Sequence, residues 1–248
     1  MIKVWWNDLK IWWLDFKRLS FVDWHWLVVW LGIYVSFILF DIMMPHFAGS
    51  ALLKYIGIFL CLVYARQKYR KDYLLTAAIF FTFVADTILV WTDFEVLGVF
   101  IFCLAQLCHI IRLTHTRPTI IALYSIAVIL IFLFAVYQGY LLPIYAITTI
   151  YAFLLCSNLY ISRRNYRKHN HDFKARCAFY AFVAFICCDA CVALRHLMLD
   201  GLISPQLLPL VAFFVWVFYY PSQVLMANSS TQPESKSVRK IAKNTTIR

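Results

Sequence analysis

The stretch RCAFYAFVAFICCDACVAL, residues 176–194, places one carboxylate, Asp189, inside a long apolar run. A helix needs about 20 predominantly apolar residues to cross the hydrocarbon core of a bilayer, and this run has that length. The whole chain shares its character, since 63% of the 248 residues are hydrophobic and only 14% are charged. The run lacks the alternating pattern of a barrel strand, and helices are the other structure that satisfies the backbone in lipid. The sequence therefore predicts an all-α membrane protein.

Eight such segments follow one another along the chain, separated by short polar breaks. The predicted spans are 24–43, 50–65, 72–91, 94–113, 118–136, 143–160, 175–196 and 206–226. They predict a polytopic bundle of eight transmembrane helices that occupies residues 24–226.

Lys and Arg alternate between the breaks and so indicate the topology. From the N-terminal segment to the tail, their numbers are 4, 0, 4, 0, 2, 0, 6, 0 and 5. By the positive-inside rule, both termini are expected on the cytoplasmic side of a cell membrane. The net charge of +11 is then mostly a topology signal that also attracts anionic membrane lipids. Nucleic acid is not an expected partner, and the pattern predicts no oligomeric state.

The two ends of the chain differ from the predicted bundle. Within residues 1–23, tryptophan and other apolar side chains share one arc of a helical wheel, which predicts an amphipathic helix lying in the membrane interface. Residues 227–248 lack apolar periodicity and are expected to form a disordered, basic cytoplasmic tail. Three parts are therefore predicted: an interfacial helix, a transmembrane domain and a tail.

All eight cysteines fall inside predicted spans, which argues against a disulfide framework. Three of them, Cys187, Cys188 and Cys191, bracket Asp189. In a membrane helix this spacing is more typical of small packing residues than of a metal site. Neither a metal nor another cofactor is predicted.

Two acids in the predicted spans, Asp86 and Asp189, are the first candidates for function. Each costs roughly 2.5 to 3.5 kcal/mol to insert if charged. Each lies 15 residues beyond a lysine, Lys71 or Lys174, which is about 22 Å along a helix. The matching depth indicates a possible parallel repeat of four helices against four, with the two acids as equivalents. The alternative is that each acid merely hydrogen-bonds a neighbouring helix or pairs with a basic residue.

Several stretches resemble the lysoplasmalogenase family, also called YhhN-like. They are ADTILVW (85–91), LGVFIFCLAQLCHIIRL (97–113), FYYPSQVLM (218–226), LLKYIGIFL (52–60) and the opening stretch around Asp189. The sequence departs from the family pattern in places: Gln106 stands where the family often has His, and His109 where it has Tyr. Eight spans is the number expected for this family.

The resemblance implies hydrolysis of the vinyl-ether bond of a lysoplasmalogen or a related lysophospholipid. It implies that Asp86 and Asp189 are the catalytic acid and base, in an order that the sequence leaves open. The expected substrate-binding residues are Lys54, Gln106, His109, Tyr220 and Gln223. Lys54 is placed to meet the lipid phosphate, because it lies near the outer end of its predicted span.

A pair of acids suits this chemistry. One carboxyl must be protonated to donate to the vinyl ether, while the other, ionised, stabilises the cation and orients water. A low-dielectric setting and a like-charged neighbour both favour the protonated form of one carboxyl. Gln106, His109 and Gln223 are harder to place in one pocket with the two acids. Counting along their spans places them nearer the cytoplasmic side than Asp86 and Asp189.

Two other functions remain open. A small proton-coupled transporter would also use paired acids within the membrane, although only six glycines are present for broken helices. A non-catalytic lipid-binding protein would use the same pocket without needing both acids.

Overall fold

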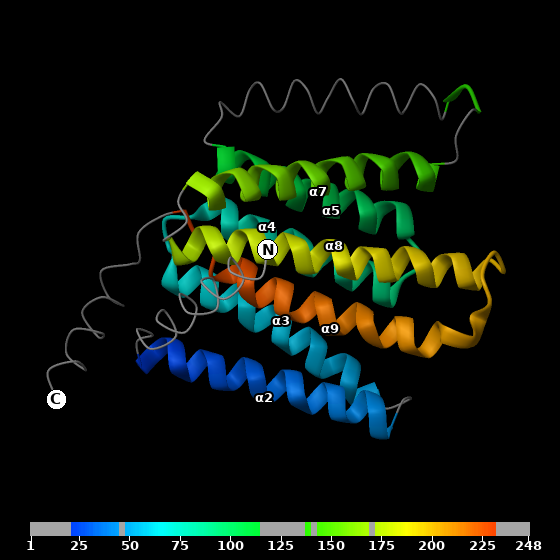
Figure 1. Cartoon of the computed structure of the whole chain (residues 1–248), viewed down its shortest axis with the longest axis horizontal. Coiled ribbons are helices and arrows are strands. Elements are labelled where there is room, and N and C mark those ends of the chain that lie inside the picture. Colours follow the sequence, from blue (N-terminus) through cyan, green and yellow to red (C-terminus); the bar gives the residue numbers. More distant parts are fainter. Residues whose placement is uncertain (1–20, 45–47, 115–136, 140–142, 169–171, 232–248) are drawn as a thin grey trace, which may run out of the picture. The chain divides into compact units, whose positions relative to one another are not determined.

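The computed structural model describes residues 21–44, 48–114, 137–139, 143–168 and 172–231. These residues form seven long α-helices, and they contain no strand. All seven are long and apolar enough to cross a membrane, which confirms the all-α membrane class. The helices are α2 (Phe21–Met43), α3 (Ala48–Lys68), α4 (Tyr73–Trp91), α5 (Glu95–Thr114), α7 (Pro143–Lys168), α8 (Phe173–Leu199) and α9 (Leu208–Ala227), and a short 3-10 helix, η1 (Pro205–Leu207), precedes α9 (Figure 1).

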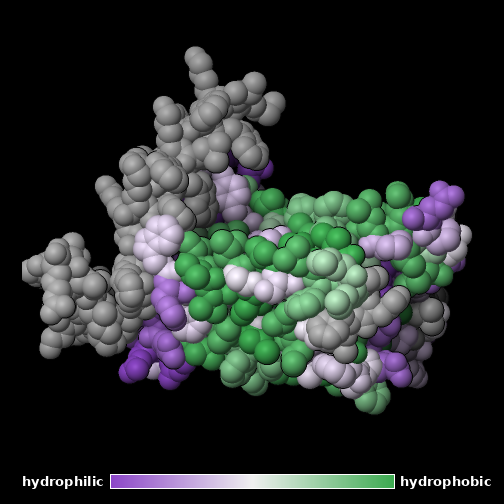
Figure 2. Space-filling model, turned by 90° about the horizontal axis from the view of Figure 1, so that it is seen from below, coloured by the Kyte–Doolittle hydropathy of each residue, from purple (hydrophilic) through white to green (hydrophobic). Residues whose placement is uncertain are grey.

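Seven of the eight predicted spans correspond to helices within the described residues. The remaining predicted span, 118–136, lies outside the described residues. Residues 1–20 of the predicted interfacial helix and the tail from 232 onward also lie outside them. The predicted count of eight therefore stays a prediction. On the face shown in Figure 2, hydrophobic residues cover the middle and hydrophilic residues gather toward two ends, as expected of spanning helices.

Four helices, α2, α3, α7 and α8, are longer than the predicted spans. The sequence predicted 143–160, whereas α7 continues to Lys168 because the polar segment after Ile161 contains neither Gly nor Pro. Similarly, α8 extends to Leu199 and ends where Gly201 adopts a positive φ of 74°. Hydropathy marks only the part of a helix that lies in the hydrocarbon core, so it misses these polar extensions.

The described helices form two compact units. Unit 1 contains α2, α3, α8 and α9, and unit 2 contains α4, α5 and α7. This grouping joins the first two described helices with the last two, whereas the predicted repeat divides the chain into a first and a second half. The parallel repeat stays a prediction.

In unit 1, a tyrosine of α9 packs directly over a glycine of α3. A Cβ atom at Gly57 of α3 would come within 2.2 Å of the Tyr220 ring of α9. The same ring stacks on Tyr34 at 5.7 Å and meets Phe37 edge-on at 5.4 Å, both from α2. Glycine at position 57 therefore lets three helices approach one another closely.

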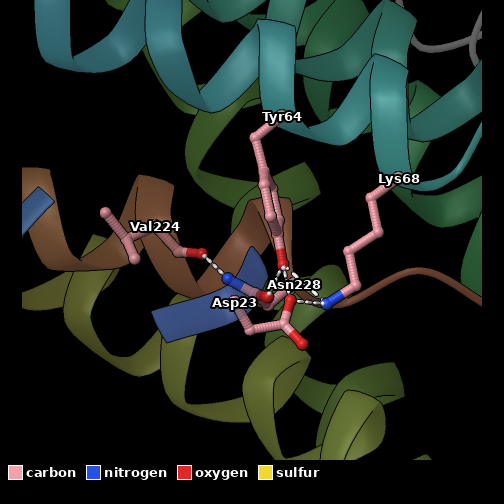
Figure 3. Close-up of polar contacts among 5 residues, drawn as sticks. All are labelled: Asp23, Tyr64, Lys68, Val224 and Asn228. Carbon is pink, nitrogen blue, oxygen red and sulfur yellow. Dashed lines mark hydrogen bonds and ion pairs between the residues drawn. The ribbon is translucent and has the colours of Figure 1, made fainter. Parts of the chain in front are cut away.

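One end of unit 1 holds a polar cluster, shown in Figure 3. Lys68 of α3 pairs with Asp23 of α2 and donates to the Tyr64 hydroxyl at 2.8 Å. Tyr64 lies within hydrogen-bond distance of Asp23, 3.1 Å, and of Asn228 Oδ1, 2.7 Å. Asn228 in turn donates to the Val224 carbonyl at 2.9 Å. The cluster ties α2 and α3 to the end of α9.

In unit 2, side-chain hydrogen bonds join the parallel helices α5 and α7. Asn158 Nδ2 on α7 donates to the backbone carbonyl and to the side-chain oxygen of Gln106 on α5, each at 2.9 Å. One more bond with the same sequence separation runs from Asn165 Nδ2 to the Leu113 carbonyl at 3.0 Å. Because both separations are 52 residues, α5 and α7 run in the same direction, as Figure 1 shows.

Candidate functional site

Asp86 lies in unit 2, on the buried face of α4. Its exposed fraction is 8%, and Thr82, one turn earlier on the same face, is 2% exposed. Helix α4 begins at Asp72, whose carboxylate accepts from the Leu75 backbone N–H at 3.1 Å. Asp86 follows 14 positions after this cap (86 − 72), about 21 Å along the helix.

Asp189 lies in unit 1, half-buried on α8. This helix also begins at a capping aspartate, Asp172, which accepts from the Lys174 backbone N–H at 3.0 Å. Asp189 follows 17 positions later (189 − 172). Counted from the caps, the two candidate acids differ by three residues, about 4.5 Å of helix, where counting from the lysines gave no difference.

The surroundings of Asp189 within unit 1 are aromatic on one side. Phe185, one turn before Asp189, is 2% exposed and meets the Tyr219 ring of α9 at 5.6 Å. Tyr219 meets the Trp216 ring edge-on at 5.5 Å. Cys188 is buried beside the acid, and no group of three metal-ligating side chains occurs among the residues that the structure describes.

Gln106 and His109 belong to a buried polar column in unit 2. Gln106 is completely buried and bound by Asn158, as described above. His109, 2% exposed, lies with Nδ1 at 3.2 Å from Arg112 Nη2. Arg112 is equally buried, and its Nη1 lies 3.9 Å from Asp72 Oδ2. The column connects the cap of α4 to the middle of α5.

Asn158 and the ionic contact between Asp72 and Arg112 are not among the features predicted from the sequence. Asn158 was detectable, because an amide inside an apolar span needs a hydrogen-bond partner. The Asp72–Arg112 contact was harder to find, because both residues look like solvated loop residues in a charge count.

Lys54 of α3 is 8% exposed and pairs with Asp41 of α2, with 2.7 Å between Nζ and Oδ2. Ser50 Oγ donates to the other carboxylate oxygen of Asp41. The Lys54 ammonium also lies over two rings, at 4.9 Å from the Trp216 centroid and 5.4 Å from that of Phe37. Asp41 was missed from the sequence, although it lies within the predicted span 24–43, three residues before the break that begins at residue 44.

Tyr220 and Gln223 lie close together on α9, which continues through Pro221 to Ala227. Tyr220 occupies the notch over Gly57, and Gln223, 2% exposed, donates from Nε2 to Ser222 Oγ at 3.4 Å. Unit 1 therefore carries Lys54, Asp189, Tyr220 and Gln223. Unit 2 carries Asp86, Gln106 and His109.

A family model described as the YhhN family matches residues 49–230. The matched segment, 182 residues long (230 − 49 + 1), is more than half of the 248 residues. The chain belongs to the YhhN family. It is the family that the stretches around Asp86, Asp189 and Gln223 resemble. A search among curated proteins and one among solved structures return no match.

The YhhN match includes α3 and every described helix after it, except for the first residue of α3. All seven candidate residues lie inside the match. Helix α2, with Asp23 and Asp41, precedes it. The Lys54–Asp41 pair therefore joins a residue of the YhhN segment to one outside it.

Proposed function

We propose that this YhhN protein is a membrane-embedded hydrolase that cleaves the vinyl-ether bond of lysoplasmalogens or related lysophospholipids. The observation that carries the proposal is the position of two carboxylates, Asp86 and Asp189, inside apolar spans of a YhhN chain. Carboxylates at membrane depth are costly and typically functional. A fatty aldehyde and a glycerophospho-base are the expected products.

The reaction needs one proton donor and one water. A protonated aspartate transfers its proton to the β-carbon of the vinyl ether. The C=C double bond is lost, and the α-carbon and the ether oxygen become an oxocarbenium ion. Water then attacks the cationic carbon, and the second aspartate, ionised, stabilises the cation and accepts a proton from that water. The hemiacetal collapses to aldehyde and alcohol, and the proton gained from water restores the starting protonation of the pair.

The remaining candidate residues are assigned to substrate binding. Tyr220 and Gln223 belong to the same unit as Asp189, and Gln106 and His109 belong to the same unit as Asp86. All four side chains are buried and carry polar atoms, which fits them to hold polar groups within an apolar bundle. We assign the enzyme to a cell membrane, with both termini cytoplasmic, on the alternation of Lys and Arg between the spans.

The test is aldehyde release by the purified protein in detergent. The substrates are a vinyl-ether lysophospholipid and its saturated-ether analogue of equal chain length. We expect aldehyde from the vinyl ether alone, and a loss of about 10²–10⁴-fold for Asp86→Asn and for Asp189→Asn.

Two exposed aspartates give matched controls, Asp93 and Asp200, which lie at the ends of α4 and α8. Their Asn variants should keep wild-type activity. Failure of folded wild-type protein to release aldehyde from any headgroup class would exclude this function and favour transport or lipid binding.

A further inference from the structure

We propose that Asp41 and Lys54 form a headgroup-binding site that selects lipids carrying both a phosphate and an ammonium group. In this site Lys54 binds the phosphate and Asp41 binds the ammonium. The inference rests on the proposed lipid substrate and extends it to a residue, Asp41, that precedes the YhhN match.

The pair retains hydrogen-bonding capacity for a ligand. An ammonium group has three N–H donors, and among the described residues the Lys54 ammonium has one ion-pair partner, Asp41. Its other neighbours there are the faces of Trp216 and Phe37. Asp41 accepts from Ser50 and Lys54 and still has a side chain that is 20% exposed. A carboxylate offers about four acceptor positions, so Asp41 also retains room for a cation.

The charges of the site favour a zwitterion. Lys54 and Asp41 sum to zero, so a headgroup with a single negative charge gains from Lys54 and is opposed by Asp41. A zwitterionic headgroup lies antiparallel to the pair, and each of the four charges then has nearest neighbours of opposite sign. Such complementarity sets selectivity more than raw affinity.

Three aromatic rings in contact, Trp216, Tyr219 and Phe185, connect the site to the turn that carries Asp189. Trp216 contacts Lys54 and lies one turn before Tyr219 on α9. Asp189 lies one turn after Phe185 on α8, and Phe185 contacts Tyr219. Consecutive helices α8 and α9 run antiparallel (Figure 1), so Trp216 and Asp189 lie on the same side of the Phe185–Tyr219 contact.

The size of the lipid determines how far the vinyl ether lies from the bound phosphate. Five covalent bonds separate the phosphorus from the sn-1 ether oxygen, which is about 6 Å when extended. In the proposed site, a phosphate held at Lys54 leaves the vinyl ether beside Trp216, the first of the rings that lead to the Asp189 turn. The aromatic side chains between them offer an apolar floor for the glycerol and the start of the chain.

The competing explanation is that the pair only joins α2 to α3. The same two helices provide a matched control, because Asp23 and Lys68 pair at their other end. If both pairs are purely structural, substitution of either aspartate should leave the headgroup preference unchanged.

The experiment measures binding of saturated-ether lysolipids, which the proposed reaction does not cleave. Purified protein in detergent is offered equal-chain mixtures with phosphocholine, phosphoethanolamine, phosphoglycerol or phosphate headgroups, and bound lipids are quantified by native mass spectrometry. Wild type should prefer the zwitterionic lipids by about tenfold or more, and Asp41→Asn should lower that preference by about tenfold. Asp23→Asn should leave it unchanged, and because the preference is a ratio within one sample, any unfolded fraction cancels.

A charge exchange separates binding from folding. The double variant Asp41→Lys, Lys54→Asp keeps an ion pair between α2 and α3 but reverses its polarity, so zwitterionic binding should fall. Wild-type preference in this variant, or equal binding of all headgroups by wild type, would overturn the proposal. The binding experiment measures no hydrolysis, so its outcome is independent of the aldehyde assay. Either proposal can therefore be rejected while the other is supported.

Discussion

Helices α2 and α3 carry an ion pair at each end, and the two pairs differ in their surroundings. Asp23 and Lys68 belong to a cluster in which the Tyr64 hydroxyl and Asn228 also take part (Figure 3). Asp41 and Lys54 have one further polar neighbour, Ser50, among the described residues, and aromatic rings around the ammonium. One pair is surrounded by polar partners, and the other faces partly outward.

The difference indicates different roles. Removing one partner of a buried pair is costly because it leaves an uncompensated charge, so a saturated cluster serves mainly to hold helices together. A pair with spare donors and acceptors and an exposed edge is instead suited to bind a charged ligand. The closely similar burial of Lys54 and Lys68, 8% and 6% exposed, shows that burial alone does not distinguish the two cases.

The largest expected stability change comes from the saturated pair. Asp23→Asn leaves Lys68 without its counter-ion and disturbs Tyr64, so we expect a loss of about 3 kcal/mol in unfolding free energy. Denaturant unfolding in detergent measures it. A loss no larger than that of Asp93→Asn, an exposed control, would show that the cluster does not hold α2 to α3.

The middle of the same helix pair gives the next largest effect. Gly57→Ala places a methyl group against the Tyr220 ring, and we expect a loss of about 1–3 kcal/mol in unfolding free energy. Gly32→Ala is the matched control on α2, since no atom lies within 4 Å of its added Cβ. Equal stability of the two variants would mean that the Tyr220 notch is not tightly packed.

The smallest stability effect is expected at the outward-facing pair. Asp41→Asn keeps a neutral acceptor for Lys54 and Ser50, and the Asp41 side chain is 20% exposed, against 13% for Asp23, so water screens the lost charge more at this pair. We expect a loss of about 1 kcal/mol, together with the change in headgroup preference described above. A loss as large as that of Asp23→Asn would remove the distinction between the two pairs.

Much of the fold could be predicted because a span is a local property. Continuous apolar runs predicted seven helices that the structure describes, and the differences lie at helix ends, above all the polar ends of α3, α7 and α8. The grouping of helices into units could not be predicted, since lipid offers no contrast between a lipid-facing and a helix-facing apolar side chain.

The candidate site was predicted unevenly for a similar reason. Asp86 and Asp189 stand out in the sequence because each is a lone charge in an apolar run. Asp41 does not, because it lies two residues before the end of α2 and resembles an ordinary boundary residue until its contact with Lys54 is known. Pairwise contacts between helices decide which boundary charges matter, and they depend on packing that the sequence does not state.

The measurement that tests the proposed function most directly is hydrolysis in D₂O. Protonation of the vinyl ether at its β-carbon predicts aldehyde with one deuterium on the carbon next to the carbonyl, when the aldehyde is trapped as it forms. Wild type should give this product, and Asp86→Asn and Asp189→Asn should not. Aldehyde without that deuterium, or equal product from the Asn variants, would contradict acid catalysis by these two residues.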